Sequence, residues 1–254
     1  MNEIIKLYAP ITLAEMSEVK LMNRIDTKFV TTAQQLTRLL LMAKDAYWMQ
    51  EIDCERNLAY DTTYFDTKDY DMYNQHQHGH TGRQKLRFRT YVSSGLQFME
   101  VKTKNNHNRT KKKRMAVKDM NINDAEKKSF LREHLRYMTN DLRPALNNHF
   151  KRITLVNKAK TERLTIDTCL EFHNLVTGVD CYMGDLAIIE LKRDGLCYSP
   201  VLEMLRQLHI HPHGFSKYCM GSALSNDHLL VNRLKPKLND IRKILSNRKI
   251  SIIC

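Results

Sequence analysis

The sequence predicts an α+β fold, with many β-strands in one domain and a few helices at the periphery. Several segments alternate apolar and ionisable residues with a period of two, as half-buried strands do. Two other segments, which include Leu36 and Leu205, repeat leucine at helical spacing. The 254 residues contain no internal repeat or Pro/Gly-rich linker. We therefore expect a single domain over residues 1–232, followed by a basic tail over 233–254.

The predicted elements follow from caps and periodicity along the chain. Helices are expected where a short polar side chain precedes an apolar repeat, since that side chain can accept a hydrogen bond from the first helical turn. The first helix is expected over 12–22, where Thr12 and Glu15 form a capping box, and the second follows Thr31 or Thr32 and carries Leu36, Leu39 and Leu40. A third is expected over 124–138 after Asn123, a fourth begins at Ser199 and Pro200, and a fifth covers 215–224. The predicted strands are 25–30, 57–66, 82–91, 95–104, 146–157, 161–170 and 186–193, and the run 105–117 is expected to begin as a polar turn and end as a basic strand.

The charge balance favours polyanionic partners. The chain has 41 Lys and Arg against 28 Asp and Glu, a net charge of +13, which suits nucleic acid, an anionic membrane surface or phosphate-rich small molecules. The six cysteines are scattered without a C-x-x-C pair, so we expect reduced thiols rather than a disulfide framework or a zinc site. The sequence shows neither a signal-peptide core nor an apolar run of membrane-spanning length. The predicted location is cytoplasmic, including the inner face of a membrane where a membrane-protein partner holds the chain.

Residues 82–91 carry the most concentrated charge in a predicted strand. They read GRQKLRFRTY, which places Leu86 and Phe88 on one face of the strand and four cations on the other. The cations are Arg83, Lys85, Arg87 and Arg89. Like charges on one face repel one another, whereas an ordinary solvated face mixes cations with acids and hydroxyls. A ligand with several phosphates would relieve this repulsion.

Other predicted strands separate ionisable from apolar side chains in the same way. The pairs that share a face are Glu100 with Lys102, Arg163 with Asp167, and Glu190 with Lys192. In one arrangement the ionisable faces point to water and the apolar faces form a common core. In another, the sheet closes into a barrel with the ionisable faces inside and helices over the apolar outside. The inward acids would then hold a divalent metal or pair with cations.

Seven segments, taken in order, resemble the polyphosphate polymerase (VTC) domain of the vacuolar transporter chaperone complex, one of the triphosphate tunnel metalloenzymes. The segments are NRIDTKFV, TTYFDTKDYDMY, GRQKLRFRTY, FMEVKTK, ERLTID, IIELK and GFSKYCMG. The resemblance spans roughly 20–222, and the order of the motifs makes it specific although each motif alone is weak. It implies a closed antiparallel β-barrel of about eight strands that forms a charged tunnel with peripheral helices.

The resemblance also implies a set of site residues. Catalytic roles are expected for Arg87, Arg89, Lys217 and Glu190, and Glu190 is the expected metal ligand. The expected phosphate-binding residues are Lys28, Arg83, Lys85, Lys102, Lys113, Arg152, Arg163 and Ser216, with Arg24 as a further contact. This chain departs from the family at two positions. Phe150 stands where the catalytic family member has tyrosine, and Ile188 stands two residues before Glu190, where a triphosphatase would carry a second carboxylate.

The implied reaction is transfer of the γ-phosphoryl group of ATP to a growing polyphosphate chain, with release of ADP. The implied partners are ATP and inorganic polyphosphate, and the implied cofactor is Mn²⁺ or Mg²⁺. The alternatives are a tunnel triphosphatase or nucleoside triphosphate hydrolase, and a non-catalytic polyphosphate-binding module. Sequence-specific nucleic acid is not an expected partner, because the basic run at 102–114 contains no aromatic residue that could stack on bases.

Overall fold

The computed structural model describes residues 1–17, 19, 24–106 and 110–246. The helices are α1 (Asn2–Lys6), α2 (Leu13–Ser17), α3 (Ala33–Ala43), α4 (Asp71–Gln77), α5 (Ala125–His134), α6 (Pro200–Gln207), α7 (Lys217–Ser225) and α8 (Lys235–Ser246), with a 3₁₀ turn at Thr139–Asp141. The strands are β1 (Ala9–Ile11), β2 (Arg24–Thr32), β3 (Tyr47–Gln50), β4 (Leu58–Thr67), β5 (Gln84–Tyr91), β6 (Gln97–Lys104), β7 (Thr110–Val117), β8 (Leu142–Asn157), β9 (Glu162–Asn174), β10 (Asp180–Tyr182) and β11 (Leu186–Asp194).

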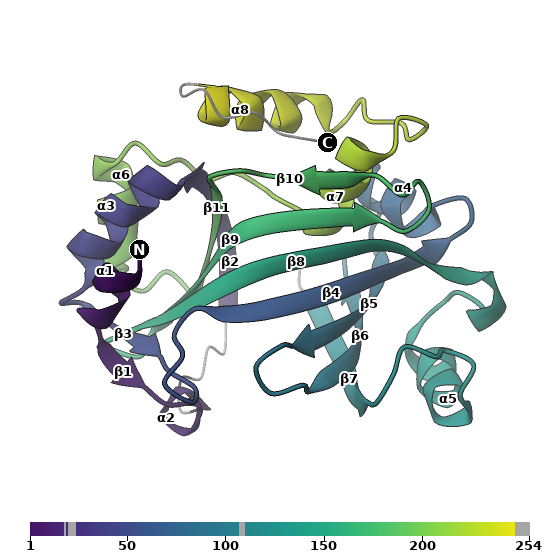
Figure 1. Ribbon diagram of the computed structural model, residues 1–254, viewed down its shortest axis with the longest axis horizontal. Coiled ribbons are helices and arrows are strands. Elements are labelled where there is room, and N and C mark those ends of the chain that lie inside the picture. The colour runs from purple at the N-terminus through teal and green to yellow at the C-terminus, as the bar shows by residue number, and fades with distance from the viewer. Residues whose placement is uncertain (18, 20–23, 107–109, 247–254) are drawn as a thin grey trace.

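An 11-stranded sheet forms the centre of the molecule (Figure 1). Its main path runs β2-β11-β9-β8-β4-β5-β6-β7, and every neighbouring pair along it is antiparallel. β3 and β10 extend the sheet from β8 and β9, and β1 pairs with β3 in parallel. The α+β class with peripheral helices is therefore confirmed.

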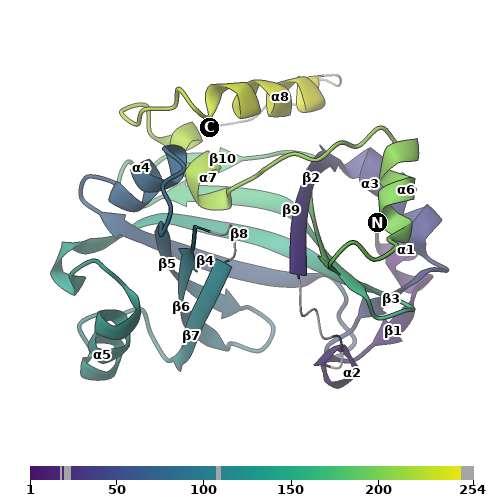
Figure 2. The same cartoon turned by 180° about the vertical axis from the view of Figure 1, so that it is seen from behind.

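The sheet is strongly curled but is not closed into a barrel, so that part of the prediction is wrong. β2 and β7 end the path, and no strand ladder joins them within the described residues. Figure 2 shows the two strands standing apart on the same side of β8. The free edge of β2 is met by a single bridge between Phe29 and Pro212. β7 is an exposed edge strand rich in lysine, and such charges disfavour further pairing. Alternation along a strand cannot reveal whether the two end strands pair.

Helices cover the apolar outer face of the curl on one side. Leu36, Leu39 and Leu40 of α3 and Leu205 of α6 pack against the buried aliphatic residues of β8, β9 and β11. This packing follows from the alternation along β11, which sends Ala187, Ile189 and Leu191 outward and Glu190 inward. Both predicted N-cap positions are confirmed: Thr32 accepts from Gln35 N, and Ser199 precedes a proline at the start of α6, although the Ser199 side chain makes no capping hydrogen bond.

A second outer cluster lies at the other arm of the sheet. Leu86, Phe88 and Met99 of β5 and β6 are fully or nearly fully buried there, against Met72 of α4 and Leu131 of α5. The cations of β5 therefore occupy the opposite, inner face, because successive side chains alternate. Helical cover over the apolar outer faces was part of the barrel arrangement, and it is found here without closure of the sheet.

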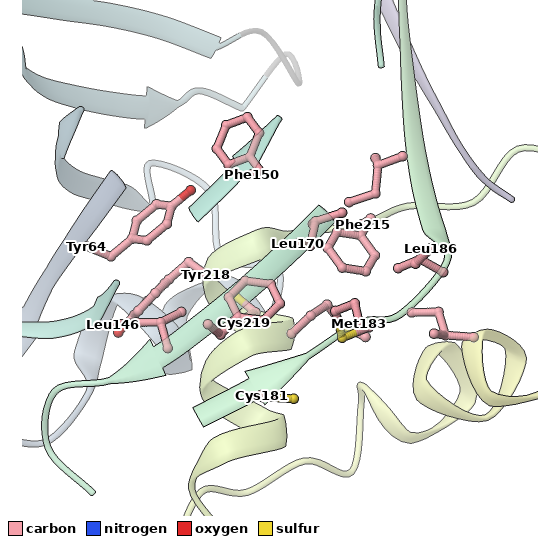
Figure 3. Packing of buried hydrophobic residues seen from close by; sticks show 14 of the residues in the cluster. Tyr64, Leu146, Phe150, Leu170, Cys181, Met183, Leu186, Phe215, Tyr218 and Cys219 are labelled. Atoms are coloured by element: carbon pink, nitrogen blue, oxygen red, sulfur yellow. The ribbon is translucent and has the colours of Figure 1, made fainter. Parts of the chain in front are cut away.

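A third cluster fills part of the inner side of the curl around α7 (Figure 3). Tyr218 lies beside Leu146, and Phe215 lies beside Leu170. α8 packs on the same cluster through three buried residues, and its described lysines and arginines are exposed. The three are Leu238, Ile241 and Leu245, and Leu234, which directly precedes the helix, is buried in the same cluster. The inner side is therefore apolar near α7 and α8, and the polar residues occupy the remainder of it.

Several boundaries differ from the prediction. α5 begins after Asp124, whose carboxylate accepts from the N–H groups of Glu126 and Lys127, so the cap expected at Asn123 is one residue early. The capping box of α2 is confirmed, since Thr12 N donates to Glu15 at 2.8 Å, but α2 ends at Ser17, and residues 18 and 20–22 lie outside the described residues.

The cysteines and the helices also test the predictions of reduced thiols and of a chain without a membrane-spanning segment. Cys54, Cys169, Cys197 and Cys219 are free thiols, as expected. Cys181 is disulfide-bonded, so the expectation of reduced thiols is wrong there. Among the described residues, no helix is both long enough and apolar enough to cross a membrane.

Substitution of Gly221 by alanine should destabilise the fold. A Cβ at this position of α7 would lie 2.5 Å from Phe172 Cδ1 and 2.7 Å from Leu146 Cδ2. Overpacking of this kind costs about 1–3 kcal/mol, which should outweigh the gain of up to about 1 kcal/mol in helix propensity. We expect a lower melting temperature for Gly221→Ala. In the control, Gly214→Ala, the added Cβ meets only the flexible end of Lys237, and equal melting temperatures for the two variants would contradict the packing argument.

Candidate phosphate-binding site

The ionisable side chains of the strands lie on the inner face of the curl, which we call the charged face. Electrostatic interactions link Lys102 of β6 with Glu190 of β11, and Lys28 of β2 with Lys85 of β5, although these strands are far apart along the sheet path. The curl therefore brings the two arms of the sheet together across this face. Strand register places the following residues on it: Lys28, Lys85, Arg87, Arg89, Glu100, Lys102, Arg152, Arg163, Asp167, Glu190 and Lys192.

Arg87 and Glu100 form a buried ion pair between β5 and β6. Arg87 Nε and Nη2 both donate to Glu100 Oε2, at 2.7 and 2.5 Å, and Lys112 Nζ of β7 lies 3.5 Å from Oε1. Burial alone would raise the pKa of Glu100, but the cations of Arg87, Arg89 and Lys112 outweigh it and lower the pKa to about 2. Glu100 is therefore ionised at neutral pH and fixes the orientation of Arg87.

Asp167 accepts hydrogen bonds from two cations that come from different elements. Arg152 of β8 donates to both carboxylate oxygens, at 2.5 and 2.8 Å, and Lys217 at the start of α7 donates to Oδ2. Burial would raise the pKa of Asp167, but Arg152 and Lys217 outweigh it and hold the pKa well below its ordinary value. Burial lowers the pKa of Lys217 to about 7, although Asp167 opposes the shift.

A stacked aromatic pair lies among three of the cations. The rings of Tyr60 and Phe150 are 5.3 Å apart and nearly parallel. The guanidinium groups of Arg89 and Arg152 lie 5.2–5.6 Å from both ring centroids, and Lys217 Nζ lies 4.4 Å from that of Phe150. Aromatic faces attract cations, so this pair stabilises charges that Glu100, Asp167 and Glu190 do not fully balance.

Glu190 is held by lysines rather than by arginine. Lys192 Nζ donates to Glu190 Oε2, and Lys28 Nζ lies 3.9 Å from Oε1. Burial would raise the pKa of Glu190, but Lys28 and Lys192 outweigh it and hold the pKa well below its ordinary value. This carboxylate is therefore charged, and its partners are flexible side chains that a stronger cation could displace.

The residues of the charged face could bind a metal ion that takes most of its ligands from the phosphate oxygens of a substrate. In the part of the chain that the structure describes, no group of three or more His, Cys, Asp or Glu side chains is suited to hold a metal. Mg²⁺ commonly binds one or two carboxylates together with substrate phosphates, and Glu190 is the carboxylate of this face best able to exchange its partner. Ile188, which precedes it on the same face, packs in the cluster around α7 and offers no second carboxylate.

The segment that leads into α7 connects the two arms of the sheet. Lys85 of β5 donates to Ser216 Oγ at 2.9 Å, and Lys28 of β2 donates to the Phe215 carbonyl at 3.0 Å. Ser216 is also the N-cap of α7 and accepts from Cys219 N, so the positive end of the helix points the same way as these cations. Ser216 and Lys217 therefore lie at the charged face, as expected.

The structure places Lys113 away from the other predicted residues. It is exposed and pairs in register with Val101, whose side chain faces the outer cluster. Its neighbour Lys112 lies on the inner face instead and approaches Glu100. The sequence TKKKR does not alternate, so the phase of β7 could not be derived from it. Lys192 and Asp167 were expected on charged strand faces but not as site residues.

Three further predicted residues lie at the margins of the charged face. Arg83 precedes β5 and donates to the His80 carbonyl at 2.7 Å. Arg24 pairs with Asp26 at 2.7 Å on the exposed start of β2. Arg163 has a buried Nε without a partner, and burial together with the charge of Arg24 lowers its pKa.

Phosphate binding to this face should weaken as the pH rises. Burial lowers the pKa of Lys85 to about 8 and that of Lys217 to about 7, so both amines lose their protons between pH 6 and 9. A charge-assisted hydrogen bond contributes about 1.5–3 kcal/mol, so the affinity for inorganic triphosphate should fall about tenfold or more. Calorimetric titration at several pH values measures this. The Lys85→Arg, Lys217→Arg protein stays charged and should give a flatter profile, and identical profiles would contradict the assignment.

The solved structures that resemble this chain do so at low sequence identity and with low TM-scores. Among solved structures, a putative adenylyl cyclase from Hippeastrum, HpAC1, described as having a dominant triphosphatase activity, is 14% identical with a TM-score of 0.46, over 82% of this chain and 97% of that chain. The PH1819 protein from Pyrococcus horikoshii OT3 is 12% identical with a TM-score of 0.41, over 79% and 98% of the two chains. Scores of this size do not establish a shared fold. No curated protein sequence matches the chain.

The family comparison is decisive by contrast. The family model described as the VTC domain matches residues 23–226, which include every predicted site residue. The resemblance inferred from the seven motifs is thereby confirmed, and the chain belongs to the VTC domain family.

Proposed function

We propose that this protein is a polyphosphate polymerase, which transfers the γ-phosphoryl group of ATP to the end of a polyphosphate chain and releases ADP. Membership of the VTC domain family supports a polyphosphate-related function and a phosphotransferase or phosphatase type of enzyme. The observation that carries the proposal is the excess of crowded cations on the charged face.

That excess remains after every acid of the face has been paired. Glu100, Asp167 and Glu190 each already contact a cation, while Lys85, Arg89 and Lys102 form no salt bridge with a described acid. The charge of Arg87, together with burial, lowers the pKa of Lys102 well below its ordinary value. Crowded cations of this kind destabilise a protein unless anions compensate them. A chain of phosphates would supply negative charge along the whole face.

The roles of the residues follow from the chemistry of phosphoryl transfer. This reaction asks mainly for positioning and for stabilisation of charge on the transferred group. In the proposal, the guanidinium groups of Arg87 and Arg89 grip phosphates through paired N–H donors. Lys217 stabilises charge on the reacting phosphoryl group. Glu190 holds Mn²⁺ or Mg²⁺, and when bound the metal neutralises charge on the phosphate oxygens.

Two other functions use the same face. A tunnel triphosphatase or nucleoside triphosphate hydrolase would transfer the phosphoryl group to water, and the apolar Ile188 beside Glu190 disfavours the version that needs two carboxylates. A non-catalytic polyphosphate-binding module would keep the cations without turnover. Phe150 favours this reading slightly, because it lacks the hydroxyl donor of the family's tyrosine. The retained Glu190 and Lys217 favour an enzyme.

Product analysis separates the three functions. The purified protein is incubated with ATP and Mn²⁺, polyphosphate is detected by gel staining, and ADP and orthophosphate are assayed. We expect a metal-dependent ladder of polymer with an equivalent amount of ADP. Release of ADP with orthophosphate alone would replace the proposal with a hydrolase, and binding of polyphosphate without turnover would replace it with a binding module.

A further inference from the structure

Asp167 occupies an unusual position among the charged residues of this site. It is an acid in a site for anions, its side chain is only 5% exposed, and its two carboxylate oxygens contact both Arg152 and Lys217. A carboxylate at this place repels a phosphate ligand and takes up N–H donors that the ligand would otherwise use. Its presence therefore requires a reason other than direct binding.

The geometry of the contacts supplies such a reason. Arg152 presents its Nε–Nη2 edge to Asp167, with one bond to each carboxylate oxygen. A guanidinium group has five N–H donors in one rigid plane, so fixing this edge directs the remaining donors of Nη1 and Nη2 away from Asp167. Lys217 spends one of its three donors on Asp167 and keeps two. The single acid thus orients two cations that come from β8 and α7.

The aromatic pair restrains the same two cations from another side. Arg152 lies 5.2 Å from the ring centroids of both Tyr60 and Phe150, and Lys217 lies 4.4 Å from that of Phe150. Arg152 and Lys217 also repel each other, because the charge of Arg152 contributes to the lowered pKa of Lys217. Without Asp167, this repulsion would drive the two cations apart across the face of Phe150.

We propose that Asp167 is a positioning residue, which holds Arg152 and Lys217 so that their remaining N–H donors converge on adjacent oxygens of a phosphate chain. This role rests on the proposed function, because it assumes a phosphate ligand, but the binding of inorganic triphosphate tests it without any turnover of ATP. It makes an unusual prediction: removal of a negative charge from an anion site weakens the binding of the anion. An account based on charge alone predicts the reverse.

The experiment compares Asp167→Asn and Asp167→Glu with the native protein. Calorimetric titration with inorganic triphosphate at fixed salt concentration gives the affinity between pH 5 and 9, and steady-state assays with ATP give kcat and KM. Glu171→Gln is the matched control, because Glu171 is an exposed acid on the same strand. Melting temperatures report whether each variant is folded. Should Asp167→Asn fail to fold, Arg152→Lys replaces it, since lysine keeps the charge but cannot form the two-bond contact with Asp167.

We expect Asp167→Asn to bind triphosphate at least tenfold more weakly and to lose about 10²-fold in kcat, the loss associated with a displacement of about 1 Å in a catalytic group. Asp167→Glu should restore part of both, and Glu171→Gln should change neither. A folded Asp167→Asn protein that binds triphosphate as tightly as the native protein, or more tightly, would overturn the proposal. If the native protein binds triphosphate but turns over no ATP, the polymerase assignment fails while the binding result still decides the role of Asp167.

Discussion

The Glu190→Gln protein is expected to lose metal-dependent turnover by about 10²–10³-fold, which corresponds to about 2.7–4 kcal/mol of transition-state stabilisation. Glu190 is the carboxylate of the charged face whose partners are the lysines at 28 and 192. Glutamine keeps the shape of the side chain but removes the charge that holds a divalent cation. Turnover of ATP measured over a range of Mn²⁺ concentrations gives both the loss in rate and the change in metal dependence.

The same substitution separates a metal ligand from a residue that only balances charge. Loss of the carboxylate frees two lysines for phosphate, so binding of metal-free polyphosphate should stay equal or become tighter while activation by Mn²⁺ disappears. Glu171→Gln is the matched control, because Glu171 is an exposed acid of β9 outside the charged face. A Glu190→Gln protein with native metal dependence would remove Glu190 from the metal site.

The parts of the fold that the sequence predicted are those that local rules control. Alternation along β5, β6 and β11 indicated which side chains share a face, and the N-cap residues Thr32 and Ser199 marked the starts of α3 and α6. Closure of the barrel was predicted wrongly, because it depends on whether β2 and β7 pair. That outcome depends on the curl of the whole sheet and on the edges of two strands, which no local period records.

The site shows the same division between local and long-range information. The cations of β5 were found because they alternate with Leu86 and Phe88. Lys113 was predicted in place of Lys112, because an unbroken run of basic residues does not show which of them face the same side of the strand. The contacts of Asp167 with Arg152 and Lys217 could not be derived either, since these partners come from β8 and from the first residue of α7. Their meeting at one carboxylate is a product of the tertiary fold.

Arg87→Ala is expected to lower stability and phosphate binding together, whereas Arg89→Ala should lower binding alone. The two arginines lie on the same face of β5, two residues apart. Arg87 pairs with Glu100, whose side chain is 1% exposed, and removal of one partner from a buried ion pair costs about 3–5 kcal/mol. Lys112 remains near Glu100 and should reduce this loss. Arg89 instead donates to Thr62, and burial with the charges of Arg87 and Arg152 lowers its pKa to about 10.

The pH dependence of unfolding tests the same contrast. The pKa of Glu100 is lowered to about 2 in the folded protein from an ordinary value of 4.5. Its ion pair therefore contributes stability that is fully present above about pH 4.5 and is lost as the pH falls towards 2. The stability difference between the native protein and Arg87→Ala should shrink over that range, and Arg89→Ala should show no such convergence. Both variants should bind inorganic triphosphate roughly 10–10²-fold more weakly, since each loses charge-assisted hydrogen bonds. Equal losses of stability in the two variants would mean that Glu100 does not depend on Arg87, and the buried pair would then have no part in fixing the arginine that the proposed reaction uses.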